Sequence, residues 1–117
     1  MTIVNLTPHE INIKTSNGMI SIPPSNLPPV RLVEKTETRK TIETSEGEIT
    51  VSAKYFGEVK NLPSSEEGKV FVVSAIAGTA IWELLPERRT DVFITGEAIR
   101  DSAGKHIGCN GLCCYPK

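Results

Sequence analysis

Hydrophobic and polar residues alternate along the first part of the chain. In residues 10–14, Ile11 and Ile13 alternate with polar neighbours, which is the period of a half-buried strand. The pair Asn17-Gly18 follows, and this dipeptide is typical of the tight turn between two antiparallel strands. Apolar positions resume in residues 19–22. The pattern therefore predicts strands joined by short turns.

A longer and more polar ribbon is predicted after the proline-rich loop at residues 23–29. Residues 30–44 carry a few Leu, Val and Ile among many Thr, Glu, Lys and Arg. Threonine favours strands, and the polarity indicates strands that are exposed to solvent or lie at a sheet edge. Glu46-Gly47 provides a turn into residues 49–53, where apolar and polar residues alternate again. We predict a hairpin over Thr38–Lys54.

One segment has helical periodicity, at about residues 74–85. Ser74 is a typical N-cap residue, and Pro86 should end the helix. Trp82 falls nearly opposite the main apolar face, among small residues, and so predicts a second packing surface. The chain's own tail or another strand, a subunit interface, and a stacked ligand remain alternatives for what covers it. The main apolar face is formed by Ile76, Ala77, Ala80, Ile81 and Leu84.

The end of the chain returns to strand patterns. A short strand is expected at residues 92–94, a turn at Gly96, and a hairpin around residues 101–104, where Gly104 should take a positive φ. Strands, one helix and a final hairpin predict a mainly β fold of the α+β class. We expect a Greek-key, β-sandwich-like antiparallel core decorated by the helix at about 74–85, in a single domain spanning residues 1–117.

Composition narrows the classes of partner. The formal net charge is -1, whereas a protein that coats duplex nucleic acid needs a basic excess. Small domains with few aromatic residues often gain stability by association, so we expect a homo-oligomer. No apolar run reaches the roughly 20 residues that span a bilayer, and no signal-peptide pattern is visible. Three cysteines crowded near the end are a poor disulfide framework. We therefore expect a cytoplasmic protein that binds neither a membrane nor duplex nucleic acid.

Metal and catalytic motifs are weak. His106 lies near Cys109, Cys113 and Cys114, but no Cys-x-x-Cys pair exists. We expect the three cysteines to be buried as small hydrophobic residues, with no metal or other cofactor. No nucleophile motif is present, and a structural role for His9 is favoured over proton transfer. We predict no catalytic residue.

Arginine is the residue with the clearest capacity for ligand binding. Its guanidinium group is the preferred partner of phosphate. Two arginines have an aspartate one or two positions further along the chain, in Arg89-x-Asp91 and Arg100-Asp101. Structural ion pairs are therefore the simpler interpretation. A nearly neutral protein with such arginines could still hold a small dianionic ligand. The candidates are Arg31, Arg39, Arg88, Arg89 and Arg100.

The motifs at the two ends of the chain point to a family. On these motifs the chain resembles the first family of phage Thoeris anti-defence proteins. The resemblance extends to Ile22-Pro23-Pro24-Ser25 and Val72-Val73-Ser74. Its main motifs are Asn5-Leu6-Thr7-Pro8-His9, Arg89-x-Asp91 and Arg100-Asp101-x-x-Gly104-x-x-Ile107-Gly108-Cys109.

The resemblance implies a sponge, meaning a protein that binds an immune signal without cleaving it. Members of that family sequester glycocyclic ADP-ribose made by bacterial TIR-domain proteins. Some also hold cyclic di- or trinucleotides at a separate site. Their pockets form between the subunits of a homo-oligomer, here a dimer or a hexamer. The implied setting is the cytoplasm of an infected bacterium.

The resemblance also suggests roles for individual residues. Arg31 and Arg100 would contact pyrophosphate or ribose oxygens, and Trp82 or Phe93 would stack on adenine. Asp91 would accept from ribose hydroxyls or orient Arg89. Arg39 and Lys40 are candidates for a second nucleotide site. Two alternatives remain: an enzyme that degrades such signals, using His9 or His106, and a structural or interaction module of a phage particle.

Overall fold

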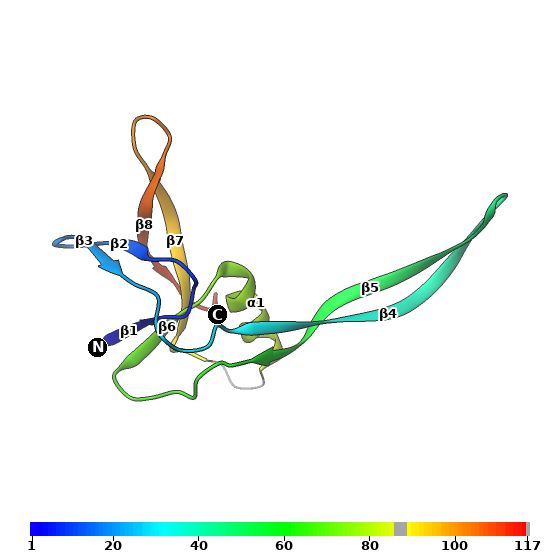
Figure 1. Ribbon diagram of the computed structural model, residues 1–117, viewed down its shortest axis with the longest axis horizontal. Helices are drawn as coiled ribbons and strands as arrows, with labels where there is room; N and C mark the ends of the chain where they lie inside the picture. Colours follow the sequence, from blue (N-terminus) through cyan, green and yellow to red (C-terminus); the bar gives the residue numbers. More distant parts are fainter. Residues whose placement is uncertain (86–88, 117) are drawn as a thin grey trace.

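The computed structural model describes residues 1–85 and 89–116, and shows a curled sheet, one helix and a long projecting hairpin (Figure 1). Two residues named above, Pro86 and Arg88, lie outside the described residues. The helix α1 spans Ala75–Leu84. The strands are β1 Thr2–Asn5, β2 Ile11–Thr15, β3 Gly18–Ile22, β4 Arg31–Thr44, β5 Gly47–Lys60, β6 Lys69–Val72, β7 Val92–Arg100 and β8 His106–Cys113.

The main sheet has six strands in the order β1-β6-β7-β8-β2-β3. The expected mainly β fold of the α+β class is confirmed. The sheet is mixed, however, where we expected antiparallel pairing: β1 pairs with β6, β6 with β7, and β2 with β8 in parallel. The helix explains the parallel pairing of β6 with β7. Adjacent parallel strands need a crossover connection, and α1 forms this connection rather than decorating the sheet.

Asn5 joins the two edges of this sheet. It lies at the end of edge strand β1 and is only 1% exposed. Its Nδ2 donates to the carbonyl oxygens of His9 at 2.7 Å and of Ile22, at the end of edge strand β3, at 3.1 Å. Its Oδ1 accepts from the backbone N of Thr7 at 2.9 Å and from the Thr7 hydroxyl at 2.6 Å. The opening Asn-Leu-Thr-Pro-His motif therefore builds a hydrogen-bonded corner around the buried Asn5 side chain, which links the two edges of the curled sheet.

The helix begins as predicted. Ser74 has extended backbone angles, and its side chain accepts a hydrogen bond from the backbone N of Ala77. The predicted buried face is only partly right, because Ile76 is 63% exposed and Leu84 is 37% exposed. The sheet instead covers the face that contains Gly78, where an added Cβ would collide with the Ile94 side chain. The core cluster consists of Leu6, Phe71, Val73, Ala77, Ile81 and Val92.

The short hairpins form where the turn residues predict them. Gly18 follows the first turn with a φ of 122°, and Gly104 closes the last with a φ of 83°. The turn predicted at Gly96 is wrong, because β7 runs unbroken through it. A Cβ at Gly96 would lie 2.5 Å from the carbonyl oxygen of Asn110 on β8. Glycine is required there by the close approach of two backbones.

Strands β4 and β5 form a hairpin that projects from the body, and we call it the arm (Figure 1). The hairpin predicted over Thr38–Lys54 is confirmed, and pairing extends it to Arg31 and Lys60. At its base, Leu32 and Val59 pack against the core. Beyond the base most arm residues are exposed. The molecule is therefore elongated, with extents of 64 × 40 × 29 Å.

Candidate functional site

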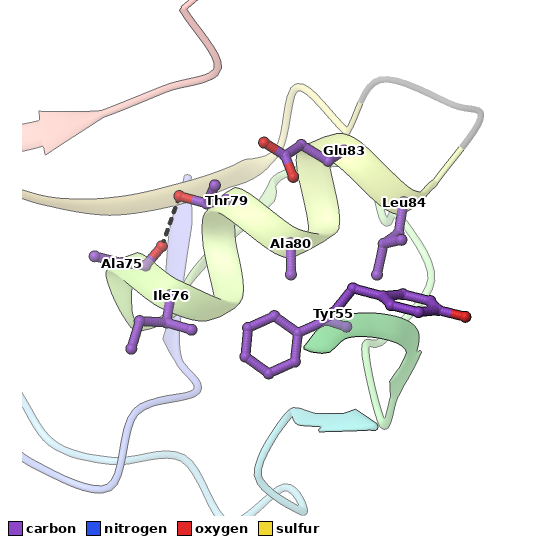
Figure 2. Close-up of a pocket in the computed structure, with 8 residues that line it drawn as sticks. Tyr55, Ala75, Ile76, Thr79, Ala80, Glu83 and Leu84 are labelled. Carbon is purple, nitrogen blue, oxygen red and sulfur yellow. Dashed lines mark hydrogen bonds between the residues drawn. The ribbon is translucent and has the colours of Figure 1, made fainter. Parts of the chain in front are cut away.

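A pocket of about 630 Å³ lies where the arm meets the helix (Figure 2). In Figure 2, Ile76, Ala80 and Leu84 point from α1 toward the strand that carries Tyr55. The helix is held over the arm because its opposite face packs on the sheet. The lining residues are Tyr55, Phe56, Ala75, Ile76, Thr79, Ala80, Glu83 and Leu84.

The pocket is apolar and keeps large side chains in contact with solvent. Tyr55 is 45% exposed and Phe56 is 36% exposed. Glu83 is the charged residue of the lining. The Thr79 hydroxyl donates to the carbonyl oxygen of Ala75 on its own helix, at 3.0 Å. A flat apolar group fits this lining, whereas a bare phosphate beside Glu83 would be repelled.

A second recess beside the same aromatic pair contains a lysine side chain, Lys54. Tyr55 and Phe56 also line a second recess, of about 220 Å³, together with Glu34 and Lys54. The Nζ of Lys54 is 3.7 Å from a carboxylate oxygen of Glu34, and both side chains are more than half exposed. Exposed pairs of this kind are weak. Lys54 is therefore available to an anionic group on a ligand that contacts the aromatic rings.

Arg89 and Asp91 form an ion pair, which the sequence suggested as an alternative to ligand binding by these residues. The Nε and Nη2 atoms of Arg89 donate to the two carboxylate oxygens at 2.8 and 3.1 Å, and Nη2 also donates to the carbonyl oxygen of Pro63 at 2.9 Å. The side chains are 10% and 15% exposed. Hydrogen bonds from Arg89 hold the pKa of Asp91 below its usual range. Asp91 orients Arg89 in this geometry, and direct contact of either with a ligand stays a prediction.

The remaining predicted site residues are not brought together within one chain. Phe93 and Arg100 lie at opposite ends of β7, separated by about 23 Å at 3.3 Å per residue. The Nη1 atom of Arg100 donates to the carbonyl oxygen of Gly104 in its own turn, at 3.0 Å. Arg31 is exposed at the start of the arm. Arg39 and Lys40 lie exposed farther along it, with Arg39 3.7 Å from Glu37. One small ligand therefore cannot contact Phe93 and Arg100 of the same chain together.

Trp82 packs against the core on one side and against the C-terminal segment on the other. Its ring lies edge-on to Tyr115, with centroids 5.9 Å apart and planes at 62°. Among the three alternatives for its second surface, cover by the chain's own tail is confirmed. The Nε1 atom is buried, and no described residue accepts a hydrogen bond from it.

The cysteines behave differently from one another. Cys109 is buried, as expected, and its thiol donates to the carbonyl oxygen of Gly111. The expected burial of Cys113 and Cys114 is wrong, because both are exposed. Cys113 is the last residue of β8, paired with Ile94 of β7, and Cys114 lies just beyond the strand. Over residues 1–85 and 89–116, no group of three His, Cys, Asp or Glu is arranged to hold a metal ion.

The sequence patterns did not single out Lys54, Tyr55 or Phe56. An adjacent aromatic pair in a mostly exposed strand was the available signal, since solvent-facing strands seldom carry two large rings in succession. No family model, curated protein or solved structure matches this chain. In the described part of the chain, no helix has the length and apolarity needed to cross a membrane.

Proposed function

We propose that this protein is a phage anti-defence sponge that binds a small nucleotide-derived immune signal and holds it without cleaving it. The signal is glycocyclic ADP-ribose from TIR-domain proteins, with cyclic di- and trinucleotides as further ligands. The setting is the cytoplasm of an infected bacterium. The carrying observation is the apolar pocket at the junction of arm and helix, with its exposed aromatic pair.

The size and lining of the pocket support binding of a nucleobase. Small-molecule sites usually occupy about 300–1,000 Å³, and this pocket of about 630 Å³ lies within that range. Stacking of a base on an aromatic side chain contributes roughly 1–3 kcal/mol. Glu83 can accept from an exocyclic amino group, and Lys54 can approach a phosphate from the neighbouring recess.

Sequestration sets different requirements from catalysis. A sponge needs slow release of its ligand, which follows from an enclosed pocket and several ordered contacts. One chain offers a half-open pocket, while Arg31 and Arg100 lie elsewhere on the surface. The homo-oligomer that the family resemblance implies, a dimer or a hexamer, would bring arginines of one subunit toward the aromatic pair of another.

A thermal-shift screen tests the proposal directly. The purified protein is heated with glycocyclic ADP-ribose isomers, cyclic dinucleotides and cyclic trinucleotides, and a bound ligand should raise the melting temperature by mass action. The ligand is then released by heat and identified by chromatography. Recovery of unchanged ligand supports a sponge. Altered ligand would indicate an enzyme, and no shift with any nucleotide would leave the phage structural module as the better explanation.

Two substitutions locate the site. Tyr55→Ala and Phe56→Ala should each weaken binding at least tenfold, the equivalent of about 1.4 kcal/mol, since each removes a stacking surface. Met19→Ala is the matched control, because Met19 is also 45% exposed but lies on β3. Equal loss in all three variants would contradict the assignment of this pocket.

A further inference from the structure

Two asparagines of this chain are followed directly by glycine, in Asn17-Gly18 and Asn110-Gly111. This sequence allows an intramolecular reaction, because the backbone N of the second residue can attack the side-chain amide carbon of the first and close a five-membered ring. Glycine in the second position has no side chain to obstruct the attack and leaves the backbone free to turn. The fold decides which of the two asparagines can reach that geometry.

Asn17 lies in an exposed two-residue turn between β2 and β3. Its backbone N donates to the Thr15 hydroxyl at 3.1 Å, and that hydroxyl donates to the carbonyl oxygen of Gly18 at 2.7 Å. A Cβ built on Gly18 would meet nothing within 4 Å, so the space beside this glycine is open. Because β3 is an edge strand of the main sheet, the tip of this hairpin opens at little cost in free energy.

Asn110 lies within β8, which has β7 on one side and β2 on the other. It pairs with Glu97 of β7, and its carbonyl oxygen lies only 2.5 Å from the position of a Cβ built on Gly96. Closing the ring would tie the Asn110 side chain to the backbone N of Gly111 and rotate the backbone between them, which requires the ladder to open. Both asparagines are exposed, so confinement of the backbone, and not access to solvent, distinguishes them.

We propose that Asn17 is a site of spontaneous deamidation in the folded protein, whereas Asn110 is protected. The backbone N of Gly18 loses its proton to hydroxide and attacks Cγ of Asn17. The new N–Cγ bond forms, the Cγ–Nδ2 bond breaks, and the amide nitrogen takes a proton from water and leaves as ammonia. One water molecule then opens the resulting succinimide at either carbonyl. The products are aspartate and isoaspartate, each with one more negative charge than asparagine.

Isoaspartate changes the hairpin, because the main chain then passes through the former Asn17 side chain and gains one methylene. The two hydrogen bonds of Thr15 across the turn depend on the original spacing. The turn also sets the register of β2 with β3, which places the carbonyl oxygen of Ile22 3.1 Å from Nδ2 of Asn5. Isoaspartate at this turn therefore weakens the corner that links the two sheet edges.

Incubation of the purified protein in warm, mildly alkaline buffer, followed by peptide mapping with mass spectrometry, tests the site. In the folded protein, Asn17 should be converted at least about tenfold faster than Asn110, because reaction at Asn110 waits for the ladder to open. In urea that unfolds the chain, the two rates should agree within about twofold, since each asparagine then has only its own glycine beside it. Asn17→Ser and Asn110→Ser are matched variants, and each should remove the product of one site alone.

The pH dependence and the stability of the product test the chemistry and its structural effect. The rate at Asn17 should rise with pH above neutrality, because the attacking nitrogen must lose its proton. The isoaspartyl form, separated by anion exchange, should melt at a lower temperature than the Asn17→Asp variant, which has the same charge and an unchanged backbone. Equal conversion of both asparagines in the folded protein, a rate that does not rise with pH, or an isoaspartyl form as stable as Asn17→Asp would each overturn the inference.

Discussion

Replacing Asn5 with leucine should show how much the opening motif contributes to the fold. Leucine keeps a similar volume but can neither donate nor accept hydrogen bonds. The substitution removes four hydrogen bonds made by a side chain that is 1% exposed. It also leaves the carbonyl oxygen of Ile22 and the backbone N of Thr7, which lie in part-buried positions, without their side-chain partner.

The expected loss of unfolding free energy is about 3 kcal/mol. A hydrogen bond contributes about 0.5–1.5 kcal/mol net, and an unsatisfied buried group costs about 1–3 kcal/mol. The Thr7 hydroxyl keeps its bond to the carbonyl oxygen of His9, at 3.0 Å, so the loss on that side is partial. For a chain of 117 residues, the change corresponds to a fall in Tm of roughly 10–15 °C. It is a large share of the 5–15 kcal/mol by which domains are usually stable.

Urea denaturation followed by the fluorescence of Trp82 measures this loss. Thr7→Val is the graded comparison and should cost about 1 kcal/mol, because it removes the hydroxyl alone. Asn5→Asp keeps the acceptor toward Thr7 but turns a carboxylate toward two carbonyl oxygens. It should therefore be destabilised at pH 7. Because this environment raises the pKa of the new carboxyl, stability relative to wild type should return as the pH falls through that raised value and be recovered below about pH 4. An Asn5→Leu protein within 0.5 kcal/mol of wild type would refute the role of Asn5 in joining the sheet edges.

Two further predictions concern the ion pair and the crowded strand pair. Asp91→Asn should lower the unfolding free energy by about 3 kcal/mol at pH 7, because it leaves the Arg89 guanidinium poorly paired in a mostly buried site. The native pKa of Asp91 is depressed, so its stabilisation is present above the unfolded value of about 3.9 and is lost as the pH falls through the native value. The difference in unfolding free energy between the Asp91→Asn variant and wild type should disappear below pH 4. A difference that does not change with pH would contradict this account. Gly96→Ala should cost about 2 kcal/mol in urea denaturation, because its Cβ meets the backbone of β8. Gly57→Ala is its control and should cost less, since the atoms nearest the added Cβ belong to the flexible Lys35 side chain.

The sequence determined the local elements of this protein. Alternation predicted the strands, turn dipeptides placed the hairpins, and Ser74 marked the start of the helix. These features depend on residues within a few positions of one another, so the pattern alone is sufficient to predict them. The motif beginning at Asn5 stood out in the sequence, but the sequence did not show that it joins two sheet edges, because its partner Ile22 lies beyond a hairpin.

The tertiary structure decided which faces are buried and where a ligand can bind. Ile76 and Leu84 have the spacing of a core face, yet they line the pocket, because the sheet packs on the side of the helix that contains Gly78. Gly96 has the sequence character of a turn and serves instead as a close contact between two strands. Tyr55 and Phe56 are neighbours in a mostly exposed strand and become one wall of a pocket only because the helix packs above them. Such contacts join residues far apart in the chain, and local periodicity carries no information about which distant segments meet.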